Sequence, residues 1–203
     1  MPTRPYRTRT RSSRPPATRE QIKTAVRELL AEGRFHDSTV EEVADRAGVA
    51  RATLYQHFRS RLELVDAICE TFAENPALVE LRAIVDRSDA VAALAETVAN
   101  RIRFWSSEDA ILRQLYGVAA VDPAARDLVD RQRADRRGEL VRLVRNLHRA
   151  RRLEEGVGRQ RAVTLLLVLT SYETFRELRE AGLSDRQITT LLQEAARRLV
   201  VAS

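Results

Sequence analysis

Three observations predict an all-α protein. Glycine and proline are scarce, with 7 and 6 among the 203 residues, whereas Ala, Leu, Arg and Glu, which favour helices, are abundant. Apolar residues recur at the spacing of amphipathic helices, and no alternation typical of strands persists. The apolar content of 44% is sufficient for a packed core in one domain or two small ones.

The expected helices follow from this spacing and from the residues that end each run. They span residues 18–32, 38–47, 50–58, 60–74, 77–86, 89–105, 108–119, 123–151, 159–181 and 184–201. Thr18 is expected to cap the first helix. Gly48 ends the second, Asn75-Pro76 ends the fourth, and Ser106-Ser107 is expected to separate the sixth from the seventh.

The N-terminal segment, residues 1–17, is expected to be a flexible basic arm, because proline, threonine, serine and arginine dominate it. Six arginines and no acidic residue occur in 1–19, whereas the rest of the chain has 29 basic and 29 acidic residues. The formal net charge of +6 therefore lies in this segment, which favours a polyanionic partner. A solvated tail without a target is the alternative that the composition leaves open.

Residues 38–58 carry the most informative pattern, two short helices joined by a tight turn. Gly48 stands where a positive φ angle is cheap only for glycine, and the apolar Val49 follows it as a buried turn residue. Ala44 and Ala47 are small enough to let two helices cross closely. This arrangement is typical of the helix-turn-helix, whose second helix lies in the major groove of DNA. Two helices of an ordinary bundle are the alternative.

The second of these helices has the side chains that base recognition requires. Arginine and glutamine can bridge purine edges, a threonine methyl can touch thymine, and a small alanine permits close approach. Leu54 and Phe58 would hold this helix from behind. The residues expected to contact DNA are Thr39, Arg51, Ala52, Thr53, Tyr55, Gln56, His57 and Arg61.

Residues 47–61, Ala-Gly-Val-Ala-Arg-Ala-Thr-Leu-Tyr-Gln-His-Phe-Arg-Ser-Arg, resemble the signature of the tetracycline-repressor (TetR) family. The resemblance extends back through residues 39–44 and covers about residues 18–68. It implies an all-α homodimer with an N-terminal three-helix DNA-binding domain and a C-terminal helical domain for ligand binding and dimerisation. The corresponding division is a basic arm at 1–17, the helix-turn-helix domain at 18–64 and the C-terminal domain at 65–203.

Two positions depart from the family pattern. Ala50 stands where serine is usual at the start of the second helix, so a side-chain cap is lost, at a cost of about 0.5–2 kcal/mol. Arg61 stands in place of the common lysine, an exchange that would keep a phosphate contact with altered geometry.

The basic arm gains a role in this context. An arm that precedes a helix-turn-helix can reach phosphates or the adjacent minor groove. The arginines expected to do so are Arg9, Arg11, Arg14 and Arg19. Deleting residues 1–17 should then flatten the salt dependence of DNA affinity, because fewer phosphate contacts release fewer counterions.

The last two expected helices are predicted to form the dimer interface. Residues 162–169 are apolar almost all round, so the helix has to be covered on every side. One face can pack on its own domain and another on a second copy of the chain. The predicted interface residues are Leu166, Leu169, Ile188, Leu191, Leu192, Ala195 and Leu199. A core helix of a monomer is the alternative.

Aromatic residues after position 76 are the candidates for lining an effector pocket, since such pockets are mostly apolar with few polar groups. The candidates are Phe104, Trp105, Tyr116, His148, Tyr172 and Phe175, each of which is also suited to the plain core. Few acids occur among them, which favours an apolar or anionic effector over a cation. The helix at 60–74 joins the two domains, and we hypothesise that an effector shifts it and alters the spacing of the recognition helices.

An enzyme is the main alternative function, and no motif supports it. His36, His57 and His148 show no metal-ligand spacing, and there is no phosphate loop, nucleophile elbow or dinucleotide fingerprint, so no metal or cofactor is expected. The single cysteine, Cys69, excludes an internal disulfide. A sequence-neutral architectural DNA binder is disfavoured by the neutral body. The expected partners are operator DNA, a small-molecule effector and a second copy of the chain, in the cytoplasm and without membrane insertion.

Overall fold

The computed structural model describes residues 15–202, with side chains from residue 17 onward, and it confirms the all-α prediction. The predicted arm up to residue 14, with Arg9, Arg11 and Arg14, lies outside the described residues. The helices are α1 (Pro15–Ala31), α2 (Val40–Arg46), α3 (Arg51–His57), α4 (Arg61–Thr71), the 3₁₀ turn η1 (Phe72–Glu74), α5 (Pro76–Ile84), α6 (Ala90–Ala119), α7 (Pro123–Arg149), α8 (Arg159–Leu169), α9 (Tyr172–Glu180) and α10 (Asp185–Val200).

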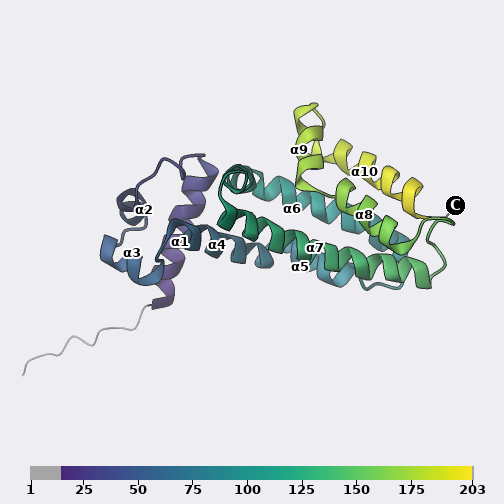
Figure 1. The fold of residues 1–203 in the computed structure, drawn as a ribbon, viewed down its shortest axis with the longest axis horizontal. Coiled ribbons are helices and arrows are strands. Elements are labelled where there is room, and N and C mark those ends of the chain that lie inside the picture. Colours follow the sequence, from purple (N-terminus) through teal and green to yellow (C-terminus); the bar gives the residue numbers. More distant parts are fainter. Residues whose placement is uncertain (1–14, 203) are drawn as a thin grey trace, which may run out of the picture.

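The helices form an elongated molecule with a small group of short helices at one end (Figure 1). In that group α1 packs on α2 and α4, and α2 packs on α3. The rest is a bundle built on α6, which contacts α5, α7 and α10, while α8 lies against α7 and α10. Helix α6 has 30 residues and is therefore about 45 Å long, so it can reach both α1 and the far end of the bundle.

Short helices in the N-terminal group begin where local chemistry stabilises them. The hydroxyl of Thr39 accepts a hydrogen bond from the backbone N–H of Glu42 at 3.1 Å, which caps α2. Ser60 caps α4 in the same way, through the N–H of Glu63 at 3.2 Å. Gly48 has a φ of +66°, so the turn between α2 and α3 uses the left-handed conformation predicted for it.

The structure corrects three predicted helix boundaries. Helix α1 already includes Pro15, so Thr18 lies inside it and not at its cap. Ser106 and Ser107 do not interrupt α6: the Ser107 hydroxyl bonds the Phe104 carbonyl of its own helix, and that of Ser106 bonds Asp185 of α10. The run predicted at 159–181 is two helices, because the chain turns at Thr170 and Ser171 caps α9.

The turn at Thr170 shows why the pattern of apolar residues did not reveal it. The Thr170 carbonyl oxygen accepts hydrogen bonds from Trp105 Nε1 at 3.1 Å and from Arg136 at 2.6 Å. Both donors come from other helices, α6 and α7. The break is therefore stabilised by tertiary contacts that local spacing does not encode. Within the described part of the chain, no helix is both long and apolar enough to span a membrane.

Candidate functional site

The recognition helix α3 is fixed to the N-terminal group by two buried side chains. Leu54 and Phe58 are each 1% exposed and face the same core as Val43 and Ala44 of α2. The turn is closed by a hydrogen bond from the Val49 N–H to the Ala44 carbonyl at 3.0 Å. Since the anchoring residues are four apart, the remaining faces of α3 are left to solvent.

The predicted contact residues on α3 lie largely on this outer side. Arg51, Ala52, Tyr55 and Gln56 are exposed, whereas Thr53 and His57 are half-buried. The guanidinium of Arg51 stacks over the Tyr55 ring at 5.5 Å and pairs with Glu41 of α2. This cluster holds Arg51 at the surface without withdrawing it from solvent, so it is available to a base edge or a phosphate.

The start of α3 lacks a side-chain cap, as its sequence predicts. Ala50 occupies the cap position in an extended conformation and makes no side-chain hydrogen bond. The helix nevertheless begins directly after it, at Arg51. Thr39, the predicted phosphate contact at the start of α2, is exposed, although its hydroxyl already caps its own helix.

Two arginines that were expected to reach DNA are engaged within the protein. Arg61 is half-buried, donates to the carbonyl oxygens of Phe35 and Ser38, and stacks on the Phe35 ring at 4.2 Å. Burial lowers its pKa. Arg19 belongs to α1 rather than to an arm; it stacks on Phe58 at 4.4 Å and donates to the His57 carbonyl at 3.3 Å. Both guanidinium groups bind neighbouring backbone carbonyl oxygens, so in this conformation neither is positioned to contact a DNA phosphate.

One further surface arginine near α3 was missed by the sequence reasoning. Arg59 follows Phe58 directly and is exposed, and its backbone N–H donates to Glu63 at 2.7 Å. The signal was present in the basic run Arg59-Ser60-Arg61 after the recognition helix. Of the two arginines in that run, Arg59 is the more exposed to solvent.

The aromatic residues predicted to line a pocket form one connected cluster in the bundle. Ring centroids are 4.9 Å apart for Phe104 and Trp105, 5.5 Å for Trp105 and Tyr172, and 4.7 Å for Tyr116 and Tyr172. Phe175 stacks on Tyr172 at 6.2 Å. The Tyr172 hydroxyl donates to the Asp109 carboxylate at 2.6 Å. Most of this cluster is therefore core that joins α6 to α9.

His148 does not belong to this cluster. It is exposed on the last turn of α7, 12 residues beyond Arg136, which contacts Trp105. That separation is about 18 Å along a helix. The prediction that His148 serves as a polar partner of the aromatic residues is wrong, because α7 carries it to the opposite end of the bundle.

A cavity of about 130 Å³ lies beside the cluster, between α4 with η1, α5, α6 and α7. Phe104 and Trp105 are the predicted residues that line it, whereas Tyr116, Tyr172 and Phe175 do not. The polar lining includes Arg101 and Arg136, which are only 6% and 8% exposed. Arg101 pairs with Glu139 at 2.5 Å.

These buried arginines were missed, although the sequence carries a signal for them. Arg101 occupies the same helical face as Val98 and Trp105, and Arg136 shares a face with Val129 and Leu140. A charged residue within an apolar stripe is unusual, because burial of an unpaired charge is costly.

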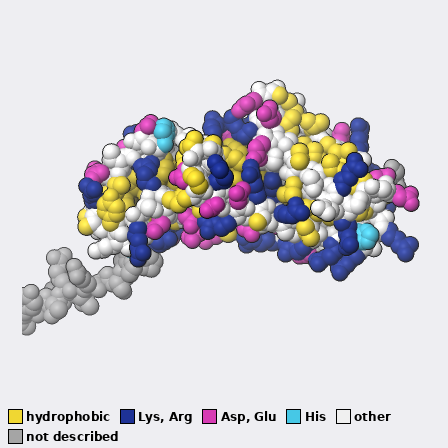
Figure 2. Space-filling model, in the orientation of Figure 1, with side chains coloured by type: hydrophobic (Ala, Val, Ile, Leu, Met, Phe, Trp, Pro, Cys, Tyr) yellow, Lys and Arg dark blue, Asp and Glu magenta, His cyan; other side chains and the backbone are white. Residues whose placement is uncertain are grey.

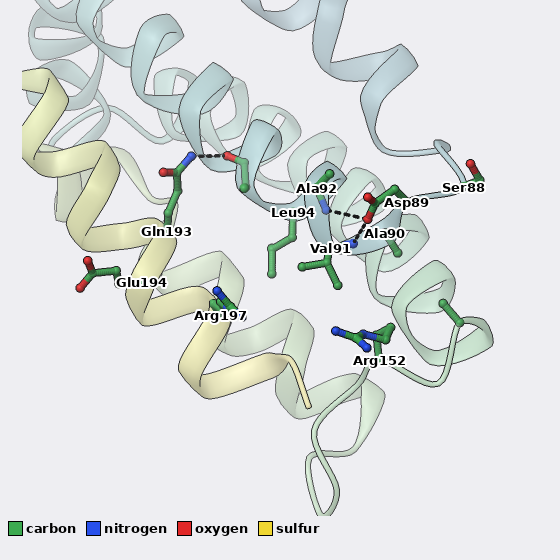
Figure 3. A pocket seen from close by; sticks show the side chains of 12 residues that line it. Ser88, Asp89, Ala90, Val91, Ala92, Leu94, Arg152, Gln193, Glu194 and Arg197 are labelled. Carbon is green, nitrogen blue, oxygen red and sulfur yellow. Dashed lines mark hydrogen bonds between the residues drawn. The ribbon is translucent and has the colours of Figure 1, made fainter. Parts of the chain in front are cut away.

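A wider hollow of about 670 Å³ lies at the far end of the bundle, between the start of α6, the end of α7 and α10 (Figure 3). Two of its polar side chains are already used: Asp89 caps α6 through the N–H groups of Val91 and Ala92, and Gln193 donates to the Ala95 carbonyl at 2.8 Å. None of the predicted ligand residues lines it. The smaller cavity, which Phe104 and Trp105 line, is therefore the candidate site for an effector.

The predicted interface residues on α8 and α10 divide into two groups. Leu166, Ile188 and Leu192 are at most 3% exposed and belong to the core of the chain itself, so they cannot contact a second copy directly. Leu191 and Leu199 are 44% and 43% exposed, and Leu169 and Ala195 are half-buried. Val168 of α8, which was not predicted, is 61% exposed. Figure 2 shows apolar side chains gathered over this part of the molecule.

No group of three or more His, Cys, Asp or Glu side chains suited to a metal ion occurs between residues 17 and 202. Fold and site together define the class: an all-α helix-turn-helix protein whose exposed recognition helix is joined to a helical body with an internal cavity.

Comparison with known proteins places the chain more narrowly. Residues 22–68 match the family of bacterial regulatory proteins, tetR family. The chain is 40% identical over 57 residues to the HTH-type transcriptional activator FasR of Mycolicibacterium smegmatis, a match that covers 28% of this chain and 26% of FasR. The helix-turn-helix segment of the chain is therefore similar to the corresponding segment of TetR-family regulators.

Two solved structures of similar shape extend the comparison to the whole fold. The SmeT–triclosan complex superimposes with a TM-score of 0.71 at 18% identity and covers 92% of this chain and 93% of SmeT. NalD of Pseudomonas aeruginosa, the secondary repressor of the MexAB-OprM efflux pump, gives 0.68 at 23% identity, over 91% of this chain and 96% of NalD. At these identities the likeness establishes the fold alone.

Proposed function

We propose that the protein is a dimeric transcriptional regulator that binds a palindromic operator through α3 and is controlled by a small-molecule effector. One observation carries the proposal: α3 is anchored by Leu54 and Phe58 and presents Arg51, Tyr55 and Gln56 to solvent. These side chains are the types that read base edges in the major groove. Operator DNA would place the protein in the cytoplasm.

The residues proposed to contact DNA are those that the structure leaves exposed or half-buried. They are Thr39, Arg51, Ala52, Thr53, Tyr55, Gln56, His57 and, in addition, Arg59. Arg61 and Arg19 are proposed to support the helix-turn-helix from within. An arm ending at residue 14 is proposed to add electrostatic affinity, and a deletion of 1–14 tests it without removing α1.

A homodimer through α8 and α10 would cover the exposed apolar residues Val168, Leu191 and Leu199. Two copies of α3 would then bind half-sites about 34–36 Å apart or a related spacing, as helix-turn-helix dimers do. The division of the chain into an N-terminal DNA-binding part, up to about residue 64, and a C-terminal effector and dimer part is proposed on the same grounds.

Two structural links support coupling between cavity and DNA. Cys69 and Phe72, at the end of α4 and in η1, line the cavity, so an occupant would press on the helix that leads to α3. Arg27 of α1 pairs with Glu108 of α6, which is 5% exposed and also accepts from Asn75 at 2.9 Å. We propose that an effector changes the position of α4 and thereby the spacing of the two α3 helices.

Of the proteins similar to this chain, FasR is named an activator and NalD a repressor. The SmeT–triclosan complex shows a protein of this fold bound to a small molecule. Repression released by the effector is the mode we propose, because occupying a promoter requires no further contacts.

The test is selection of bound duplexes from a random library by the purified protein. A palindromic consensus is expected, and Gln56→Ala or Arg51→Ala should weaken binding to it by about ten- to 100-fold, since a good base contact is worth about 1–3 kcal/mol. Arg186→Ala, an exposed arginine of α10, is the matched control and should bind as the unaltered protein does. Equal binding to selected and random duplexes would overturn the proposal and indicate an architectural binder.

A further inference from the structure

The internal cavity holds more positive than negative charge. Among its lining residues are three arginines, Arg82, Arg101 and Arg136, and two carboxylates, Asp135 and Glu139. Glu139 is bound to Arg101 at 2.5 Å, and Arg82 and Asp135 are exposed at the rim. Inside the cavity, the charge that lacks a counterion is therefore that of Arg136.

Arg136 is held in place without being neutralised. It is 8% exposed, and its guanidinium donates to the Thr170 carbonyl at 2.6 Å. The nearby Glu173 is bound to Arg133 at 2.5 Å, and no carboxylate of the described residues lies within ion-pair distance of Arg136. Burial, and then the positive charge of Arg101, lower the pKa of Arg136 to about 10. An arginine in this setting is charged at neutral pH and lacks an anion.

A second unpaired donor belongs to a residue that lines the same cavity. The Nε2 atom of Gln132, one turn before Arg136 on α7, is buried without an oxygen or nitrogen acceptor among the described residues. Its near neighbour is the Cys69 thiol, which is a weak acceptor. Buried polar groups are rarely left unpaired, so each such group requires an explanation. An acceptor placed between Gln132 and Arg136 would satisfy both.

The remaining walls are apolar and flat. Phe72, Phe104 and Trp105 line the cavity, and the Phe72 and Phe104 rings meet edge to face at 5.6 Å. The volume of about 130 Å³ is close to that of cavities that hold a single benzene ring, about 150 Å³. The site thus joins a ring-sized apolar space to a polar corner with two donors and one excess positive charge.

We propose that the effector of this protein is a small organic monoanion, a carboxylate on a compact aromatic or ring-sized body, bound with its carboxylate on Arg136 and Gln132. The inference rests on the proposed function, for which it names the class of ligand. A neutral ring of the same size would leave Arg136 uncompensated, and a cation would be repelled.

The position of the cavity connects this ligand to DNA binding. Its body would contact Phe72 of η1 and lie beside Cys69 of α4, at the end of the helix that follows the recognition helix. Its carboxylate would bind α7. Occupation therefore fixes α4 and η1 against α7, which biases the element that both sites share.

The experiment measures binding in the absence of DNA, with benzoate as the probe and benzamide and benzamidine as its neutral and cationic counterparts. Trp105 is the only tryptophan of the chain and lines the cavity, so its fluorescence reports occupation directly. Benzoate should bind about ten- to 100-fold more tightly than benzamide, as expected for a charge-assisted hydrogen bond. Benzamidine should not bind, and sodium sulfate at equal ionic strength should leave the signal unchanged.

Variants assign the effect to Arg136. Arg136→Gln should remove the preference for benzoate over benzamide, and Arg136→Lys should keep part of it. Arg137→Gln, the exposed neighbour on the same helix, is the matched control and should bind benzoate normally. Circular dichroism establishes that each variant is folded; if Arg136→Gln is not, Gln132→Leu provides the second test and should weaken benzoate more than benzamide.

Equal affinity for benzoate and benzamide, no binding of either, or undiminished benzoate binding by a folded Arg136→Gln protein would each overturn the inference. These outcomes differ from failure of the proposed function. If the protein selects an operator but does not bind benzoate, only the proposed ligand class is wrong. If it binds benzoate but does not discriminate between duplexes, the proposed DNA-binding role is wrong.

Discussion

The two ends of the molecule differ in how deeply the arginines of their proposed sites are buried. In the group α1–α4, the arginine proposed to contact bases lies at the surface, with the Arg51 side chain 60% exposed. In the bundle α5–α10, Arg101 and Arg136 are nearly completely buried. Burial of a guanidinium costs several kcal/mol unless an anion compensates it, so a protein is not expected to retain it without a reason. The comparison supports the proposal that DNA binds at the surface of one region and the effector inside the other.

The same two regions differ in how recognisable their sequences are. Residues 22–68 match a family model, whereas SmeT and NalD, which cover 92% and 91% of the chain, share only 18% and 23% of its residues. A tight turn and three short helices constrain nearly every position, as Gly48 illustrates. A bundle core requires mainly apolar residues of suitable size, and many combinations satisfy it.

The largest expected effect on stability tests how strongly the N-terminal group of helices depends on the buried side chain of Phe58. Phe58→Ala should lower the free energy of unfolding by about 3–5 kcal/mol, because a fully buried ring leaves a cavity when truncated. Urea unfolding followed by circular dichroism measures this loss. Tyr55→Ala, on the exposed side of α3, is the control and should change the value by about 0.5 kcal/mol or less. Similar losses for both would contradict the anchoring described here.

A second prediction tests the contrast in charge. Arg136→Met should leave the free energy of unfolding unchanged or raise it by about 1–3 kcal/mol, because the buried charge is replaced by an apolar chain of similar length. Arg137→Met, at the surface, should have almost no effect. A clear loss of stability in Arg136→Met would mean that the Thr170 hydrogen bond outweighs the burial of charge. Denaturant midpoints of the two variants decide between these results.

A smaller loss of stability is expected from the contact between α1 and α6, which joins the two regions. Glu108→Ala removes the acceptor of both Arg27 and Asn75 and should cost about 1–3 kcal/mol, near the lower value because the Arg27 side chain is 39% exposed. Glu96→Ala, which breaks the exposed pair with Arg87, should cost less than about 1 kcal/mol. The thermal unfolding midpoints of both variants provide the measurement. Equal shifts would show that the junction is no more than a surface contact.

The smallest expected effect concerns acid. Burial opposes ionisation of Asp109, but hydrogen bonds from Tyr172 and Arg113 outweigh it and lower its pKa. An acid with a lowered pKa in the folded state contributes stability above its unfolded pKa of about 3.9 and loses that contribution as the pH falls further. Asp109→Asn should therefore cost about 1 kcal/mol at pH 7 and less at pH 3.

Asp127, exposed on α7, is the control for the acid prediction. Asp127→Asn should give the same small change at both pH values. Urea midpoints at pH 7 and pH 3 provide the comparison. A loss in Asp109→Asn that is equal at the two pH values would show that the interaction does not depend on the ionised carboxylate.

Much of the fold could be predicted because its signals are local. The turn at Gly48, the exposed side of α3 and the anchors Leu54 and Phe58 all follow from residues a few positions apart. The uncapped start at Ala50 was also visible in the sequence. A φ angle, a cap or a helical face depends on near neighbours, so the sequence by itself determined that the protein is all-α with a helix-turn-helix near its N-terminus.

The rest was decided by tertiary structure. The break at Thr170 depends on donors from α6 and α7, and Arg61 is turned inward by carbonyl groups more than 20 residues away. His148 and Arg136 occupy the same helix, yet only Arg136 reaches the cavity. Contacts between distant segments depend on how the helices are arranged in space, and helical spacing places a residue on a face without saying what that face meets.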